Sequence, residues 1–381
     1  MQKTVPFERI ALLLQGGGAL GSYQAGVYQA LAEANLHPDW TAGISIGAVN
    51  SALIAGNPPE KRVDALKAFW EGVTAAPLGP PVELMRAMGF TAPKGDFAHS
   101  LVNQMRAFGN LVAGAPTFFT PRLVPPYFSP PGTVEAQSFY DVSPLRATLE
   151  RLVDFDRINA GDMRFSVGAV NVRSGNFTYF DTTTHEIGPE HVMASGSLPP
   201  GFPATLVDGE PYWDGGLVSN TPLQWVLENK PRKDTLAFQV DLWSAKGEMP
   251  RDLVAQEVRQ KDIRFSSRTR AATDAFTRMQ RMRRALGRLL EQVPDAAALE
   301  EDPELKALIA EADDKVYNIV HLIYHAKNYE GASKDYEFSR LTMEEHWAAG
   351  YADMVRTLRF PEALARPQNP EGIATFDIAE H

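Results

Sequence analysis

Hydrophobic and polar positions in the first part of the chain follow the periods of alternating strands and helices. Residues Ile10–Leu14 are apolar without a break and run into glycines, which is typical of a strand buried on both faces of a parallel sheet. Apolar residues then recur at helical spacing over residues 23–31, and a short strand is expected at Trp40–Ile44. A helix of small residues, AVNSALIA, comes next and ends at Gly56. This β-α-β-α order with short connections predicts the beginning of a wound α/β sheet.

Two hairpins are expected in the middle of the chain. Arg164–Val172 and Phe177–Phe180 form the first, around a Ser-Gly-Asn turn. In TLVDGEPYWDGG, the pair Asp208-Gly209 is the turn and Asp214 ends the returning strand. Two further elements should complete a main domain over residues 1–245, namely a helix at Thr221–Asn229 and a core strand at residues 236–243.

Residues 77–144 interrupt this pattern, because they are apolar yet broken by prolines and glycines, as in RLVPPYFSPPG. The segment has little periodicity and cannot form one long helix. Either it packs as an irregular, proline-rich insertion in the main domain, or it forms a lid or lipid-facing flap, since long ordered loops are often functional.

Residues 246–381 are expected to form a mainly helical extension with one strand, VYNIVHLIY, that packs on the core. One helix is amphipathic and could lie on anionic lipid, but the acidic residues at 300–314 favour a helical hairpin with matched charges. Thr342 and Glu345 predict a capping box before the last long helix. The apolar positions of the amphipathic helix are Met279, Met282, Leu286, Leu289, Leu290 and Val293, and its basic positions are Arg281, Arg284 and Arg288.

Composition narrows the functional classes. The 381 residues carry a formal net charge of -10, which argues against a general nucleic-acid-binding protein, because affinity for phosphate needs clustered Lys and Arg. Cysteine is absent, which excludes disulfides and thiolate metal sites. A chain without cysteine suits a reducing compartment. The apolar run near the N-terminus is too short for a signal peptide, and no run reaches the roughly 20 residues of a membrane span. We therefore expect a cytoplasmic protein that can meet a membrane only peripherally, at its surface.

The first glycine-rich turn, GGGALG at Gly16–Gly21, lies between a strand and a helix and satisfies the dinucleotide-binding pattern G-x-G-x-x-G. Such a site needs an acidic residue near the end of the second strand. Asp39 has about the right distance, but it precedes its strand and would lie at the opposite edge of the sheet. This placement argues against a nucleotide site.

The second turn, GISIG, has the G-x-S-x-G pattern of a nucleophile elbow and places Ser45 between a strand and a helix. Gly43 and Gly47 are small because the two backbones approach closely there. In a parallel sheet, both glycine-rich turns lie at the same carboxyl edge. One turn can then carry the attacking hydroxyl while the Gly17 and Gly18 amides bind an oxyanion. The simpler alternative is that the glycines only allow a tight turn.

A serine nucleophile needs a base. In the order Ser, acid, His, the base could be His321 or His325, although a histidine inside a predicted strand, such as His321, more often has a core role. Asp214 ends a strand between an aromatic residue and two glycines. Such an apolar and open position would raise the pKa of its carboxyl toward a useful range, so we favour Asp214.

The three pieces GGGALG, GISIG and DGG, in this order, resemble the patatin-like phospholipase family. The blocks ASGSLPPGFP at Ala194–Pro203 and DGGLVSNTPL at residues 214–223 look like the family's segments around its second catalytic residue. The resemblance covers roughly Ile10 to Asp241 without the insertion, and the C-terminal part looks like an extension seen in a bacterial subgroup. It implies a patatin-like three-layer α/β/α domain with a mostly parallel central sheet.

The resemblance also implies a lipid acyl hydrolase of phospholipase A, lysophospholipase or esterase type, with neither a metal nor an organic cofactor. Asn220 is expected to cap the following helix rather than to orient the DGG turn. Many family members carry Arg or Lys where Leu20 stands, which makes a phospholipid preference less secure than ester hydrolysis. The implied roles are Ser45 as nucleophile, Asp214 as base without a histidine, Gly16, Gly17 and Gly18 as oxyanion loop, and Gly43, Gly47, Gly215 and Gly216 as supporting positions.

Three functional hypotheses follow. The first is a hydrolase of lipids or other hydrophobic esters, which the intact serine, aspartate and glycine loop favour. The second is an acyltransferase on a related serine-elbow fold, which would need a histidine base and a thioester donor. The third is a non-catalytic lipid-binding protein whose helical C-terminus carries the function. The protein could also contact a membrane peripherally, and it could associate into a homo-oligomer.

Overall fold

A computed structural model describes residues 5–75, 107, 109–110, 112–266, 269–294, 299, 301–327 and 330–378, with only the backbone of residues 269–272 and 332. The insertion expected at residues 77–144 is therefore described in its second part. Its residues 77–106, 108 and 111 lie outside the described residues.

The described residues form one nine-stranded sheet with the strand order β11-β10-β9-β1-β2-β5-β8-β7, and β6 pairs with β5. The pairings from β11 to β5 are parallel, whereas β6, β7 and β8 are antiparallel to their neighbours. A separate two-stranded ribbon joins β3 (Thr120–Pro121) and β4 (Tyr140–Asp141). The strands of the sheet are β1 (Arg9–Leu14), β2 (Trp40–Ile44), β5 (Arg164–Asn171), β6 (Phe177–Asp181), β7 (Thr205–Val207), β8 (Glu210–Asp214), β9 (Thr235–Asp241), β10 (Tyr317–Ile323) and β11 (Ile373–Asp377).

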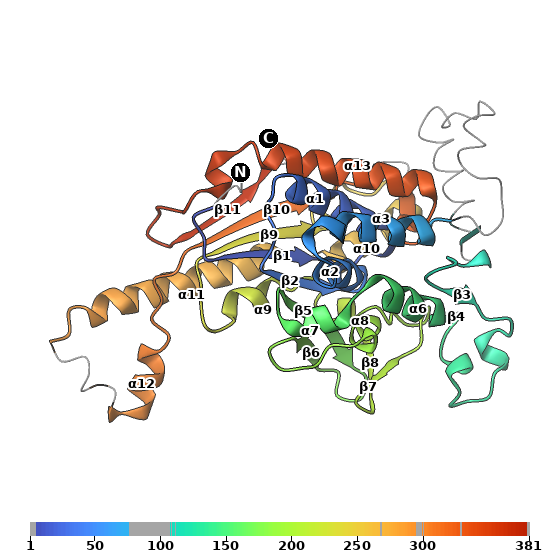
Figure 1. Cartoon of the computed structure of the whole chain (residues 1–381), viewed down its shortest axis with the longest axis horizontal. Coiled ribbons are helices and arrows are strands. Elements are labelled where there is room, and N and C mark those ends of the chain that lie inside the picture. Colours follow the sequence, from blue (N-terminus) through green and yellow to red (C-terminus); the bar gives the residue numbers. More distant parts are fainter. Residues whose placement is uncertain are drawn as a thin grey trace.

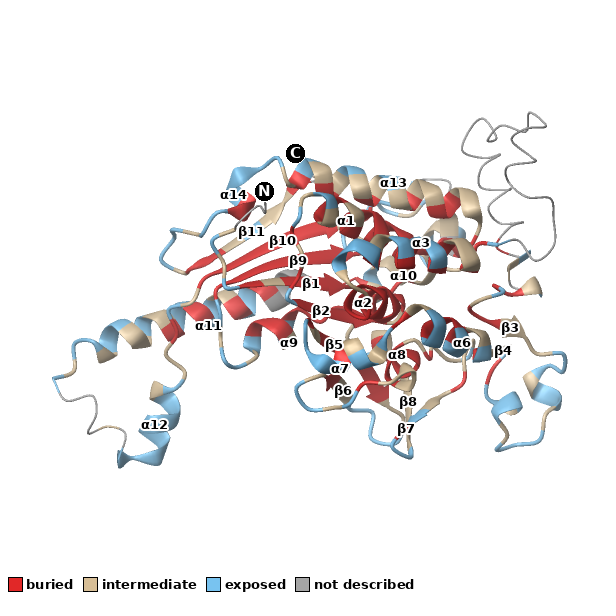
Figure 2. Ribbon diagram, in the orientation of Figure 1, coloured by how far each residue is buried: buried red, intermediate tan, exposed pale blue. Residues whose placement is uncertain are grey.

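Helices cover both faces of this sheet, which gives the expected three layers (Figure 1). The apolar residues of α1, α2 and α13 pack on one face, and those of α9 and α11 pack on the other. Figure 2 shows that the central strands are buried throughout, while α12 and the segment around β3 and β4 are largely exposed. The helices are α1 (Ser22–Glu33), α2 (Ile46–Ala55), α3 (Arg62–Val73), α6 (Ser143–Leu152), α7 (Phe155–Ala160), α8 (Pro189–Ser195), α9 (Leu223–Glu228), α10 (Leu253–Phe265), α11 (Thr269–Leu290), α12 (Pro303–Ile309), α13 (Arg340–Thr357) and α14 (Pro361–Leu364).

The elements predicted from local patterns are confirmed for the main domain. The order β1-α1-β2-α2 matches the expected start of the wound sheet, and β5 with β6 forms the first hairpin. β7 and β8 form the second hairpin, where Asp208 and Gly209 have φ values of 50° and 80°. Positive φ at both central residues is the requirement of the tight turns that suit a twisted hairpin.

The C-terminal extension differs from its prediction in two details. It contributes two strands to the sheet, β10 and β11, where the sequence predicts one. The short β11, with the sequence IATFD, carries too weak a pattern to be recognised as a strand. The capping box at Thr342 and Glu345 is wrong, because α13 begins three residues earlier and Ser339 is the residue whose side chain accepts the Thr342 amide.

Acidic side chains and backbone carbonyls of the same chain bind part of the arginines of the amphipathic helix α11. Arg281 pairs with Glu371 at 2.6 Å, and Arg284 donates to the carbonyl of Asp314. In the acidic stretch, Glu311 pairs with Arg283 of α11 and also with Lys230 and Arg232 of the main domain. Within the described ranges, no helix is both long enough and apolar enough to cross a bilayer.

Candidate active site

Ser45 occupies the sharp turn between β2 and α2. Its φ and ψ are 55° and -123°, a backbone conformation that L-residues rarely adopt. The start of α2 lies close to both β2 and β1. A Cβ atom on Gly43 would lie 2.2 Å from the carbonyl oxygen of Gly47, and one on Gly47 would lie 2.2 Å from the carbonyl oxygen of Leu14 in β1. The G-x-S-x-G pattern therefore reflects backbone contact on both sides of the serine.

Asp214 lies at the end of β8, with 2% of the residue exposed. Its carboxylate accepts hydrogen bonds from the Ser45 side chain and from the Gly216 amide, the latter at 2.7 Å. Burial raises the pKa of the Asp214 carboxyl from 3.8 to about 6, against the smaller lowering effect of these two hydrogen bonds. At neutral pH the site thus holds an ionised, poorly hydrated carboxylate next to a serine hydroxyl.

Strand register explains why these two residues meet. Ile44, which precedes the serine, pairs with Gly168 of β5, and the next residue of β5, Ala169, pairs with Asp214. The Gly215 backbone then passes close to β5, since a Cβ atom there would lie 2.5 Å from the carbonyl oxygen of Gly168. β5 therefore links the serine turn and the DGG turn as the strand between them.

The loop Gly16–Gly18 runs beside Ser45. A Cβ atom on Gly16 would lie 3.0 Å from the Ser45 Cβ and 2.4 Å from the Asn220 Oδ1, so a side chain there has no room. Gly18 has a φ of +56° and begins a short 3-10 turn. Within the part of the chain that the structure describes, no acceptor receives a hydrogen bond from the amide of Gly17 or of Gly18.

Asn220 does not cap the following helix, contrary to the expectation from the sequence. The residue at the N-terminus of α9 is Pro222, and the Asn220 amide instead donates to the carbonyls of Gly16, at 3.1 Å, and Phe265, at 2.8 Å. A Cβ atom on Gly216 would lie 3.0 Å from the Asn220 Oδ1. Asn220 therefore connects the glycine loop, the DGG turn and the end of α10.

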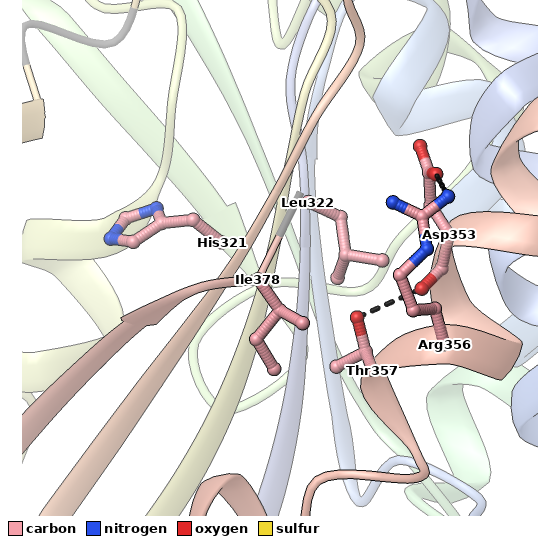
Figure 3. Close-up of a pocket in the computed structure, with 6 residues that line it drawn as sticks. All are labelled: His321, Leu322, Asp353, Arg356, Thr357 and Ile378. Carbon is pink, nitrogen blue, oxygen red and sulfur yellow. Dashed lines mark hydrogen bonds and ion pairs between the residues drawn. The ribbon is translucent and has the colours of Figure 1, made fainter. Parts of the chain in front are cut away.

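The alternative base His321 belongs to another environment. It lies in β10, and its Nδ1 is 3.7 Å from the Asp241 Oδ2. Figure 3 shows its ring on one side of the strand, while Leu322 points to the other side, toward Thr357 of α13. In the described residues, neither His321 nor His325 forms a hydrogen bond or an ion pair with Ser45 or Asp214.

The structure places Asp39, the acidic residue of the nucleotide-site alternative. The Asp39 carboxylate accepts the Ile10 amide at 2.8 Å, so it lies at the amino end of β1, opposite the glycine loop, as expected. No group of three or more His, Asp or Glu residues among those described is arranged to hold a metal ion.

Three residues that touch the site are not apparent as site residues from the sequence. Ser195 accepts the Ser45 amide at 3.0 Å and donates to the carbonyl of Gly168 at 2.6 Å. The Trp243 indole donates to the Gly16 carbonyl at 2.8 Å, and the Phe265 carbonyl accepts from Asn220. Only Ser195 had a signal, because it lies in the block ASGSLPPGFP.

A family model described as patatin-like phospholipase matches residues 12–227, and a second, described as patatin phospholipase, matches residues 263–370. None of the curated proteins matches the chain.

Solved structures that match the chain include VipD from Legionella pneumophila, with 15% identity and a TM-score of 0.38, covering 98% of this chain and 72% of VipD. They also include the ExoU-SpcU complex from the type III secretion system of Pseudomonas aeruginosa, with 16% identity and a TM-score of 0.27, covering 95% of this chain and 73% of the other. The first family match spans more than half of the chain and includes the glycine loop, the serine turn and the DGG turn. The chain therefore belongs to the patatin-like phospholipase family.

Proposed function

We propose that this protein is a serine acyl hydrolase that cleaves carboxylic ester bonds of lipids through a dyad of Ser45 and Asp214. The observation that carries the proposal is the hydrogen bond between the serine hydroxyl and a buried carboxylate whose pKa is raised to about 6. A base works best when its pKa lies near the operating pH. A carboxyl with an ordinary pKa would be a much weaker base than Asp214 in this position.

The reaction follows from the positions of these groups. The Ser45 Oγ attacks the ester carbonyl while its proton passes to Asp214, and the Gly17 and Gly18 amides stabilise the oxyanion. The tetrahedral intermediate then loses the alcohol, which takes the proton from Asp214, and leaves an acyl-serine. Asp214 next accepts a proton from water, whose oxygen attacks the acyl carbonyl. Collapse of the second intermediate releases the carboxylic acid and returns the proton to the Ser45 oxygen.

Family membership supports lipid esters as the substrate class. Cleavage of phospholipase A, lysophospholipase or simpler esterase type is compatible with the same dyad, because all three release an acyl chain from an oxygen. The competing acyltransferase would need a histidine base. The candidate for that base, His321, has Asp241 as its ionisable neighbour.

We further propose peripheral contact with the lipid surface through residues 121–139, called here the proline-rich flap. Leu123, Tyr127 and Phe128 are almost fully exposed, and no charged residue occurs between positions 123 and 134. The flap is attached close to the site, since the Phe139 amide donates to the carbonyl of Pro200 and the Ser197 carbonyl accepts the Asp214 amide. An exposed apolar segment next to a lipid-cleaving site suits insertion among lipids.

The test is a series of esters and phospholipids of increasing acyl length, assayed with the wild type, Ser45→Ala and Asp214→Asn. Both variants should lose about 1,000-fold or more in kcat with folding preserved, as for removal of a member of a catalytic triad. A fluorophosphonate should label Ser45 in the wild type. His321→Gln is the matched control and should keep its turnover. Near-full turnover of Asp214→Asn, or loss of turnover in His321→Gln alone, would disprove the dyad.

A further inference from the structure

The C-terminal extension touches the glycine loop from outside the main domain. The Ala19 amide donates to the carbonyl of Asp335 at 2.8 Å. The same carbonyl oxygen lies against Gly18, where a Cβ atom would be 2.1 Å away. Asp335 therefore binds the amide next to the two that the proposed function assigns to the oxyanion.

The other side of the loop is fixed through the end of α10. The Phe265 carbonyl accepts from the side-chain amides of Gln15, at 3.1 Å, and Asn220, at 2.8 Å. Asn220 and Trp243 both donate to the carbonyl of Gly16. These contacts restrain the backbone of Gly16–Gly18, which has no side chains that could hold it in place.

Two ion pairs hold the Asp335 backbone and α10 together. Lys261 pairs with Asp335 at 2.5 Å, and Asp262 pairs with Lys334 at 2.6 Å. The Lys334 Nζ also lies 5.0 Å from the centre of the Trp243 ring, and only 5% of this residue is exposed. Partly buried pairs of this kind are screened less by salt than surface pairs. We call Lys261, Asp262, Lys334 and Asp335 the α10 clamp.

We propose that the α10 clamp positions the oxyanion loop, so that the C-terminal extension is a working part of the acyl-transfer site. This role of the clamp rests on the proposed function, in which the Gly17 and Gly18 amides bind the oxyanion. An oxyanion donor must lie within a few tenths of an ångström of its place, and loss of one donor typically costs about 100- to 1,000-fold in kcat. A loop of three glycines cannot supply that precision alone, because glycine has the greatest backbone freedom. Asp262 and Lys334 are thus positioning residues, acting through Trp243 and the Asp335 carbonyl.

The test uses the full-length variants Asp262→Asn, Lys334→Met and their combination, with a soluble short-chain ester. We expect kcat to fall about tenfold or more while KM changes less than about twofold, because the loop acts on the transition state. The rate of Ser45 labelling by a fluorophosphonate should fall in parallel, and the pH midpoint of the rate should stay where the wild type has it. The double variant should lose no more than the worse single variant, since both substitutions break one pair.

Arg281→Met is the matched control, because it breaks a 2.6 Å ion pair with Glu371 elsewhere in the same extension. It should leave kcat and KM unchanged. Wild-type kcat in both Asp262→Asn and Lys334→Met would overturn the proposal. A rise in KM alone, or a shifted pH midpoint, would also overturn it, because the pair would then act on substrate binding or on Asp214.

Hydrogen exchange keeps the proposal testable if Lys334→Met does not fold. In Asp262→Asn, the amides of residues 15–22 should exchange faster than in the wild type, and unchanged exchange there would overturn the clamp. This readout is independent of activity. If wild-type protein cleaves no ester and Ser45 is not labelled, the proposed function fails, while the exchange experiment still reports on the clamp.

Discussion

The Ser45 hydroxyl donates a hydrogen bond to the Asp214 carboxylate, which is buried and has a pKa raised to about 6. The serine belongs to a strained turn after β2, and the aspartate ends an antiparallel strand from a later part of the chain. Two opposing effects act on the carboxyl. Burial raises its pKa, and the hydrogen bonds from Ser45 and Gly216 lower it, so the balance between them sets the pH range in which the carboxylate can accept a proton.

The rate of ester cleavage should therefore depend on ionisation of one group. The kcat/KM for a soluble ester should rise about tenfold per pH unit below the pKa of Asp214 and level off above it, because only the ionised form accepts the proton of Ser45. The midpoint should lie near pH 6. A pH-rate profile measures it, and a midpoint close to the ordinary value of an aspartate would show that burial does not control this base.

Removing the charge should stabilise the protein while abolishing its activity. The pKa of Asp214 is higher in the folded than in the unfolded state, so its contribution to stability is full below the unfolded value and is lost as the pH rises through the folded value of about 6. At pH 8, Asp214→Asn should raise the free energy of unfolding by about 1 to 3 kcal/mol.

Urea unfolding at pH 8 and at pH 5 checks this linkage. The gain should shrink at pH 5, because the wild-type carboxyl is then largely protonated in the folded state. Asp208→Asn is the control, since Asp208 lies in an exposed hairpin turn and should respond little. An equal gain at both pH values would assign the stabilisation to something other than the charge.

The serine turn should also store backbone strain. Ser45→Gly should raise the free energy of unfolding by about 1 kcal/mol, because glycine adopts its φ of 55° and ψ of -123° without a Cβ contact. Measurement at pH 5 separates this effect from the ionisation of Asp214. Asn35→Gly, at a φ of 54°, is the comparison and should gain less, since asparagine tolerates the left-handed region. A destabilised Ser45→Gly variant would show that the turn is not strained.

The glycines around the serine should tolerate no side chain. Gly47→Ala should lower the free energy of unfolding by at least about 3 kcal/mol, because its Cβ would lie 2.2 Å from the Leu14 carbonyl oxygen and backbone cannot move aside cheaply. Gly287→Ala, within α11, meets nothing within 4 Å and should stabilise by up to about 1 kcal/mol through helix propensity. Denaturant midpoints of the two variants compare them directly, and a neutral Gly47→Ala would contradict the close approach of β1 and α2.

The turns that carry the proposed dyad were predictable because each has a local cause. Gly43 and Gly47 mark a close strand-helix turn, and Asp214 follows an alternating strand with a recognisable Asp-Gly hairpin. Each signal spans about ten residues, and the parallel order of the first strands brings the two glycine-rich turns to one edge. The sequence therefore predicts the sheet, the elbow and the acidic turn.

The supporting contacts were not predictable, because their partners are far apart in the sequence. Asn220 reads as a helix cap, yet its amide reaches Gly16 and Phe265. Lys334 and Asp335 lie in a short stretch without periodicity, and only the docking of the extension brings them to α10 and the glycine loop. Composition and spacing carry no information on such pairings, since many exposed lysines and aspartates have the same local surroundings.

The proline-rich flap should carry the protein to lipid surfaces. The triple substitution Leu123→Ser, Tyr127→Ser and Phe128→Ser should weaken binding to phosphatidylcholine vesicles about 10-fold or more, because each large apolar side chain gains about 1.5 to 3 kcal/mol on full burial. Hydrolysis in vesicles should fall in parallel, whereas turnover of a soluble short-chain ester should stay unchanged. Vesicle sedimentation and the two assays measure these effects.

The amphipathic helix α11 is the rival surface, and it lies at the other end of the molecule from the flap (Figure 1). Met282→Ser with Leu289→Ser is the matched control, because both side chains are exposed and apolar but stand among arginines. Binding through the flap, whose residues 123–134 carry no charge, should be insensitive to salt and to anionic lipid, while binding through α11 would need anionic lipid and weaken with salt. Loss of vesicle binding in the α11 variant alone would therefore place the lipid surface at the end of the molecule remote from β3 and β4, and the flap would have no part in it.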